Sequence, residues 1–255
     1  MHETIELSVA GGVMRLVLNR PDKMNALNSR MRAEITAALT ALPEEVRCVV
    51  LTGAGRGFCS GQDLTDAGAA LDLEGTLRDE YEPMLHAIRD CRVPVISAVN
   101  GVAAGAGANL ALAADLVIAA ESASFIQAFT RIGLIPDAGG TWFIPRQVGT
   151  ARAMGMMLLA EPVPARQAAD WGMIWQAVPD AEFEAVVRAR AEQLAAGPTG
   201  CYRAIRQALA ASSQNDLAAQ LALEARLQGD AGRRSDFREG VAAFLEKRTA
   251  RFTGA

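Results

Sequence analysis

The stretch PVISAVNGVAAGAGANLALAADLVIA, residues 94–119, decides the fold class of this chain. It begins with an apolar run (94–99), continues through a glycine-rich loop (100–108) and a run of small helix-forming residues, and ends with a second apolar run (115–119). Continuous apolar runs of this length are typical of strands that are buried on both faces of a parallel sheet. The stretch therefore predicts a strand–loop–helix–strand unit of an α/β protein, with ligand chemistry outside the carboxyl ends of the strands.

The same pattern recurs toward the N-terminus. Residues 48–52 form another apolar run, and a second glycine-rich loop, residues 53–61, follows it directly. A hairpin around Gly11-Gly12 and two helices, the first capped by Asn28 or Ser29, complete this half. The expected strands are 4–9 and 13–18, and the expected helices are 29–41 and 77–89.

Beyond about residue 180 the apolar pattern is helical only. One predicted helix is apolar on two faces, which are formed by Leu217 with Leu221 and by Leu223 with Leu227. Such a helix usually packs on both sides, so we expect a subunit interface there. We divide the chain into a core, residues 1–195, and a helical C-terminal region, residues 196–255.

The composition narrows the function class. The chain has 255 residues, of which 51% are apolar, and a net charge of −4, which argues against general nucleic-acid binding. Its longest apolar runs are interrupted by Gly, Asn and Asp, so no membrane span is expected, and no signal peptide is visible. The four cysteines form no Cys-x-x-Cys pair and the chain has two histidines, so we expect no metal site and a cytoplasmic protein with reduced thiols.

The two glycine-rich loops are the first chemical signal. Residues 53–63 (GAGRGFCSGQD) and residues 101–107 (GVAAGAG) each follow a predicted strand. Two such loops side by side could aim two main-chain N–H groups at one atom, which stabilises an oxyanion without charged side chains. The alternative is that both are simply tight turns. Neither loop contains the Gly-Lys pair of a phosphate-binding loop.

The second signal is Asp137 in the segment IGLIPDAGGT, residues 132–141. Apolar residues stand just before and just after it. The functional interpretation is an acid/base in an apolar pocket, where desolvation raises its pKa. The alternative is that Asp137 caps the helix that follows.

Other polar residues are weaker candidates. Ser60 could suggest a serine hydrolase, but the glycine two residues before it, which a nucleophile elbow needs, is missing. We interpret His86 as a partnered surface or core residue, Asp63 and Asp66 as loop caps, and Asp115 as structural.

At these segments the chain resembles the crotonase (enoyl-CoA hydratase/isomerase) superfamily. The matching segments follow one another along nearly the whole chain and are LNRP (18–21), NALN (25–28), GFCSGQDL (57–64), VNGVAAGAG (99–107), DLVIA (115–119), GLIPDAGGT (133–141) and EGVAAFLEKR (239–248).

The resemblance implies a spiral of repeated ββα units, a helical C-terminal trimerisation region, and a homotrimer or a dimer of trimers. It implies an acyl-CoA substrate, with coenzyme A as part of the substrate and no separate cofactor. The oxyanion hole would use the main-chain N–H groups of Gln62 and Ala106. Coenzyme A would lie along the chain near Lys23, Asn25 and Ala26, and the tail residues Phe244 and Lys247 match positions that can reach the coenzyme of a neighbouring subunit.

Two departures from the hydratase pattern narrow the reaction. The positions of the two hydratase glutamates are occupied by Asn109 and Phe129, and neither can be an acid or base. The position of Asp137 is usually glycine in hydratases and acidic in several isomerases. Proton transfer by one carboxylate is therefore favoured over addition of water.

Within the family, the chain most resembles the isomerases of phenylacetate degradation that convert ring-1,2-epoxyphenylacetyl-CoA to oxepin-CoA. The matching segments are 53–59, 135–142, 151–155, 170–176 and 251–254. Three alternatives stay open: a Δ3,Δ2-enoyl-CoA isomerase of fatty-acid oxidation, a non-catalytic acyl-CoA-binding scaffold, and a serine peptidase on the same spiral fold.

Overall fold

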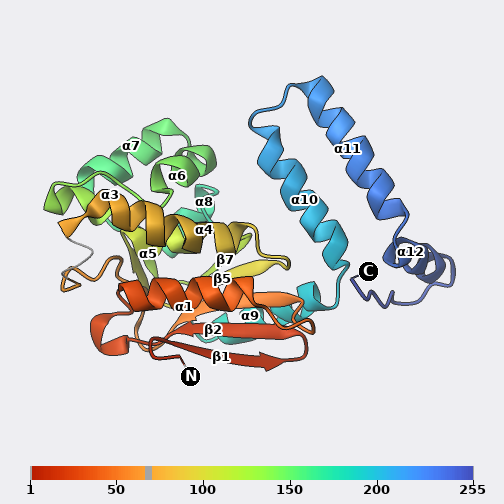
Figure 1. The fold of residues 1–255 in the computed structure, drawn as a ribbon, viewed down its shortest axis with the longest axis horizontal. Helices are drawn as coiled ribbons and strands as arrows, with labels where there is room; N and C mark the ends of the chain where they lie inside the picture. Colours follow the sequence, from red (N-terminus) through yellow and green to blue (C-terminus); the bar gives the residue numbers. More distant parts are fainter. Residues whose placement is uncertain (1, 67–70, 255) are drawn as a thin grey trace.

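The computed structural model describes residues 2–66 and 71–254, which form two β-sheets covered by helices (Figure 1). The larger sheet has six strands in the order β1-β2-β3-β5-β7-β10. β1 and β2 pair antiparallel, and all other neighbours pair parallel. The bounds are β1 (Ile5–Ala10), β2 (Val13–Leu18), β3 (Cys48–Gly53), β5 (Val95–Val99), β7 (Leu116–Ala120) and β10 (Gln176–Val178).

The smaller sheet has the strand order β4-β6-β8-β9, with β4 (Gly57–Cys59), β6 (Val102–Ala104), β8 (Ser124–Ile126) and β9 (Val163–Pro164). Three times in succession, a strand of the larger sheet leads into a strand of the smaller sheet and then into a helix: β3 with β4, β5 with β6, and β7 with β8. This repeated ββα arrangement is the spiral that the resemblance predicts. It places the loops that follow β4, β6 and β8 next to one another.

The helices cover both faces of the larger sheet. Side chains alternate across a strand, so Val49 and Leu51 of β3 face one hydrophobic cluster while Val50 faces another, which contains α9. The helices are η1 (Pro21–Lys23), α1 (Ser29–Thr40), α3 (Leu73–Thr76), η2 (Leu77–Tyr81), α4 (Glu82–Arg89), α5 (Ala106–Leu112), η3 (Ala128–Ile132), α6 (Gly140–Val148), α7 (Thr150–Leu159), α8 (Ala165–Asp170), α9 (Phe183–Ala195), α10 (Thr199–Ser212), α11 (Leu217–Gly232) and α12 (Ser235–Leu245).

The predicted elements lie close to the observed ones. The predicted strands begin and end within one residue of β1, β2, β3, β5 and β7. Asn28 caps α1, because its side-chain oxygen accepts a hydrogen bond from the Met31 N–H at 2.9 Å. The helix predicted at 77–89 is longer than expected: it starts at Leu73 and passes through the π-helical turn η2 before α4.

The C-terminal helices α10 and α11 run side by side and lean away from the sheets (Figure 1). Arg206 of α10 attaches them to the core, because its Nε lies 2.7 Å from Asp115 and its other nitrogens donate to carbonyl groups at the end of α4. Asp115 also accepts a hydrogen bond from the Val95 N–H at 2.8 Å, which confirms its structural role. The division at residue 195 itself stays a prediction. Within the described residues, each helix is too short or too polar to cross a lipid bilayer.

Candidate active site

A cavity of about 390 Å³ brings the three main predicted site residues together. Gln62, Ala106 and Asp137 all line it, although they come from three different ββα units. The remaining lining is mostly apolar and consists of Ser60, Gly61, Leu64, Leu73, Gly105, Ala128, Phe129, Arg131, Ile132 and Leu134. Of the described residues around this cavity, Asp137 alone carries a carboxyl group.

The first glycine-rich loop turns the Gln62 N–H away from its neighbouring chain segment. The Leu27 N–H donates to the Gly61 carbonyl at 2.8 Å, and the Asp63 N–H donates to the Leu27 carbonyl at 3.0 Å. These two bonds flank Gln62 in a parallel bridge, so the Gln62 N–H faces the side opposite Leu27. Within the described part of the chain, that N–H donates to no other group. It is therefore free for a ligand.

The second glycine-rich loop ends at the start of α5. Gly105 has a φ of 53° and ψ of −127°, and α5 begins with Ala106. The first N–H groups of a helix have no partner within the helix. The first turn closes at Asn109, whose N–H donates to the Gly105 carbonyl at 3.2 Å. Among the residues that the structure describes, the Ala106 N–H donates to no acceptor, so it is a second unpaired main-chain donor at this cavity.

The two glycine-rich loops come into close contact at Gly61. β4 and β6 pair parallel, and Gly61 follows β4 with a φ of 94°. A Cβ atom at Gly61 would lie 2.8 Å from the Ala104 carbonyl oxygen and 3.4 Å from the Ala106 nitrogen. Only glycine fits this close approach and this φ. The two loops lie side by side at the same cavity, which favours the oxyanion interpretation over two simple tight turns.

Asp137 lines the same cavity in a largely apolar environment. It is half-buried, and its Oδ1 is buried without a hydrogen-bond partner in the described residues. Burial raises the pKa of Asp137 to about 6, against a small lowering by its own backbone. The helix α6 starts at Gly140 and receives no side-chain cap. The alternative that Asp137 caps this helix is therefore wrong.

The two positions that correspond to the hydratase glutamates have different surroundings. Phe129 lines the cavity, and its ring packs against Gly105. Asn109 is fully buried behind the cavity, where its side chain contacts the peptide of Asp137. Neither residue brings a second carboxylate to the site.

The predicted coenzyme-binding segment lies beside the first glycine-rich loop. The Ser60 N–H donates to the Met24 carbonyl at 3.0 Å, and Lys23 is exposed next to it. Asn25 and Ala26 are buried, and the Asn25 side chain is fully used: it accepts from the Arg20 N–H and donates to the carbonyls of Ala54 and Gly57, each at 2.9 Å. Asn25 therefore shapes the loop and has no side-chain atom left for a ligand.

Phe244 and Lys247 lie at the end of α12 and just beyond it. Phe244 is 83% exposed, and neither residue lines the cavity of its own chain. A role at the coenzyme of a neighbouring subunit stays a prediction.

The remaining candidates have structural partners. The Ser60 hydroxyl donates to the Lys23 carbonyl, while His86 lies on the surface between Glu82 and Asp90 and His2 lies near Glu34. Ser60 pairs with neither histidine, which removes the support for a serine peptidase. Asp63 caps its loop by accepting from the Thr65 N–H and hydroxyl.

Sequence reasoning missed most of the apolar cavity wall. Leu64 precedes α3 and Leu73 is its first residue, while Ile132 and Leu134 come from η3 and the turn after it. Neither segment has a clear periodic pattern. The only sequence signal for the second group is that it immediately precedes Asp137.

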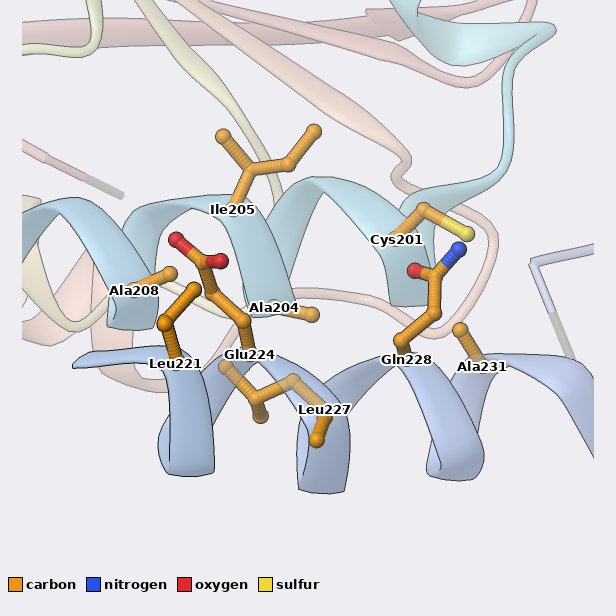
Figure 2. Close-up of a pocket in the computed structure, with 10 residues that line it drawn as sticks. Cys201, Ala204, Ile205, Ala208, Leu221, Glu224, Leu227, Gln228 and Ala231 are labelled. Atoms are coloured by element: carbon orange, nitrogen blue, oxygen red, sulfur yellow. The ribbon is translucent and has the colours of Figure 1, made fainter. Parts of the chain in front are cut away.

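A second and larger hollow of about 550 Å³ lies between α10 and α11 (Figure 2). Figure 2 shows Glu224 and Gln228 extending from α11 toward α10, with Cys201 and Ala204 on α10. The hollow has no glycine-rich loop and a single carboxylate, Glu224, among its described lining residues. It lacks the donors of the first cavity.

Comparison with known proteins shows which family and which relatives the chain is similar to. The model of the enoyl-CoA hydratase/isomerase family matches residues 8–255. A protein of Rhodobacter capsulatus named "Probable enoyl-CoA hydratase" is 61% identical over 254 residues, which cover 99% of each chain. The 1,2-epoxyphenylacetyl-CoA isomerase of Escherichia coli K12 is 49% identical over 261 residues, which cover all of both chains.

Solved structures show the same fold. The crystal structure of an enoyl-CoA hydratase from Bacillus anthracis superposes with a TM-score of 0.92 at 32% identity. The superposition covers 99% of this chain and all of that one.

Proposed function

Because the chain belongs to the enoyl-CoA hydratase/isomerase (crotonase) family, we propose that it is an acyl-CoA isomerase that converts ring-1,2-epoxyphenylacetyl-CoA to oxepin-CoA in aerobic phenylacetate degradation. The relative from Escherichia coli, with 49% identity over the full length, has this substrate in its name. The observation that carries the proposal is that Asp137 is the one carboxyl group among the described residues of a cavity where the N–H groups of Gln62 and Ala106 have no acceptor in the described chain.

The first step of the proposed reaction is activation of the thioester. The carbonyl oxygen accepts hydrogen bonds from the N–H groups of Gln62 and Ala106. These donors stabilise the enolate, which makes the α-hydrogens more acidic. Fixed donors in a largely apolar cavity do not have to reorient when the charge develops, so their effect is greater than in water.

The second step is proton transfer by Asp137. Its carboxylate removes an α-proton and becomes a carboxylic acid. The enolate electrons help to open the strained epoxide, and the ring expands to a seven-membered oxygen heterocycle. Asp137 then returns the proton to a ring carbon, so the product has the same composition as the substrate. A pKa of about 6 suits a group that must accept and then donate a proton near neutral pH.

The name of the Rhodobacter capsulatus relative raises the competing possibility of a hydratase. Adding water needs groups that position and activate it. In this chain the two positions of the hydratase glutamates hold Asn109, which is buried behind the cavity, and Phe129, which lines it. Both residues support isomerisation over hydration.

One assay separates the candidate reactions. Purified protein is given ring-1,2-epoxyphenylacetyl-CoA, a linear 3-enoyl-CoA and crotonyl-CoA, and products are followed by absorbance and mass spectrometry. We expect rapid conversion of the epoxide and little or no hydration of crotonyl-CoA. Preferred turnover of the linear substrate would favour the Δ3,Δ2-enoyl-CoA isomerase, efficient hydration the hydratase, and binding without turnover the scaffold.

The pH dependence of the reaction should reflect the raised pKa of Asp137. As the base of the first step, Asp137 must be ionised in the free enzyme. Its pKa is raised from 3.8 to about 6, so it is protonated and inactive at pH 5. We therefore expect kcat/KM to rise with pH through a midpoint near 6 and to level off above it. A profile that is flat from pH 5 to 8 would contradict this assignment.

We also propose that the exposed C-terminal helices form the contacts of a homotrimer or a dimer of trimers. Leu221 on α11 and Phe237 on α12 are both more than half exposed although they are large and apolar. Replacing Leu221 with glutamate should weaken assembly, because it places a charge on this surface. Light scattering after size-exclusion chromatography would show a smaller mass than for the wild type. An unchanged mass would place the contacts elsewhere.

A further inference from the structure

The buried side-chain amide of Asn109 connects α5, which carries the Ala106 N–H, to the segment that carries Asp137. The Asn109 Nδ2 donates to the Asp137 carbonyl at 2.8 Å, and the Asn109 Oδ1 accepts from the Gln127 Nε2 at 2.9 Å. Asn109 and Gln127 are both 0% exposed. Asn109 therefore holds residues 127 and 137, which are the two ends of a segment that we call the wall segment.

The wall segment, residues 127–137, forms much of the cavity. It contributes six of the described lining residues: Ala128, Phe129, Arg131, Ile132, Leu134 and Asp137. Apart from η3 it has no regular secondary structure. It is held by isolated main-chain hydrogen bonds, such as the one from the Leu134 N–H to the Phe129 carbonyl at 3.1 Å. A segment with so few main-chain bonds depends on side chains for its position.

Asn109 also lies on α5, the helix that begins with Ala106. It lies three residues after Ala106 on α5, which is about one helical turn. The packing leaves it little room: a Cβ atom at Gly140 would lie 2.8 Å from the Asn109 Cγ. The same side chain is thus fixed to α5, to Gln127 and to the peptide of Asp137.

We infer that Asn109, held by Gln127, is a positioning residue that sets the place of the Asp137 carboxyl group relative to the Ala106 N–H. This inference rests on the proposed function. The α-carbon of a thioester bound at Ala106 must lie within reach of Asp137, and that distance is set by the link from α5 to the wall segment. Asn109 itself is not among the described residues that line the cavity.

Replacing Asn109 with alanine should lower kcat more than it changes KM. A shift of about 1 Å in a reacting group can cost about 100-fold in rate, so we expect a loss of that order. The coenzyme segment near Lys23 is attached elsewhere, so KM should stay within about threefold. A loosened wall segment also admits water to Asp137, so the pH midpoint of kcat/KM should move down from about 6.

Gln127 gives an independent test of the same link. Gln127→Met removes the donor to Asn109 while keeping a side chain of similar length, so it should lower kcat in the same direction but less. If the two residues act through one link, the double variant should lose no more than Asn109→Ala alone.

Thr52→Val is the matched control for a lost buried hydrogen bond. Thr52 is buried in β3, and its hydroxyl donates to the Ala98 carbonyl at 2.8 Å, away from the cavity lining. We expect it to lower thermal stability without changing kcat or the pH midpoint. Asp137→Asn is assayed in parallel on ring-1,2-epoxyphenylacetyl-CoA, well below the unfolding temperature of every variant.

The outcomes distinguish failure of the proposed function from failure of the positioning role of Asn109. If Asp137→Asn turns over like the wild type, the proposed function itself is wrong. If Asp137→Asn is inactive while Asn109→Ala keeps wild-type kcat, the inference is overturned. It is also overturned if Thr52→Val loses as much kcat as Asn109→Ala, because the loss would then follow from any buried bond.

Discussion

Asp137→Asn should reduce turnover of ring-1,2-epoxyphenylacetyl-CoA by about 10³–10⁴-fold, since general acid–base groups contribute about 10²–10⁴ and Asp137 serves in both proton transfers. Asparagine has nearly the same shape and no exchangeable carboxyl proton. The cavity and its two main-chain donors stay intact. Binding of a non-reactive acyl-CoA should therefore change little, which titration calorimetry can measure beside the steady-state kinetics.

The same variant should be more stable than the wild type at alkaline pH. The folded-state pKa of Asp137, about 6, lies above its ordinary value of 3.8, so the folded protein binds this proton more tightly than the unfolded chain. Asp137 thus costs no stability below pH 3.8, and its cost grows as the pH rises through 6. The gain in melting temperature of Asp137→Asn should grow over this interval. Turnover near the wild-type rate, or loss of stability at pH 8, would contradict the role of Asp137 as a desolvated base.

Gly61→Ala should lower kcat/KM by about 100- to 1000-fold, the usual effect of losing one oxyanion-hole donor. The added Cβ would lie 2.8 Å from the Ala104 carbonyl oxygen, and the residue would keep a φ of 94° that alanine rarely adopts. Relief of this contact must move the loop that carries the Gln62 N–H away from Ala106. The change is measured by steady-state kinetics on the ring-epoxide thioester.

Gly11→Ala is the control for backbone strain without a steric clash. Gly11 also has a positive φ, of 57°, but a Cβ there would meet no atom within 4 Å. It lies in the turn between β1 and β2, so it should lose some stability and keep its activity. Equal losses in the two variants, or full activity of Gly61→Ala, would show that close packing of the glycine-rich loops does not support catalysis.

Much of the core could be predicted because its signals are local. The run 48–52 is apolar at every position but its last, since β3 packs hydrophobic clusters on both faces, and Asn28 marks the start of α1. The glycine-rich loops could be predicted because the close approach of two main chains excludes every side chain. Asp137 could be singled out because an acid among apolar residues is unusual.

The rest depends on contacts between segments far apart in the chain. The position of the wall segment follows from Asn109 and Gln127, which are separated by 18 residues. The sequence marks Asn109 only as a replaced hydratase glutamate, and it gives no sign that the two side chains meet. The early start of the helix before α4 follows from the π-helical turn at Leu77–Tyr81, where Glu80 pairs with the buried Arg32 of α1 at 2.7 Å. A sequence motif also does not show that the Asn25 side chain is used up by hydrogen bonds to Arg20, Ala54 and Gly57.

In the proposed mechanism the two groups that grip the thioester oxygen belong to the main chain, at Gln62 and Ala106. Their chemistry does not depend on which side chains these two residues carry. Neighbouring side chains such as Leu64 and Leu73 shape the cavity without supplying a donor. Mutation can therefore alter which acyl group is preferred while the activation step is inherited with the backbone, and this separation makes the scaffold easy to adapt to new substrates.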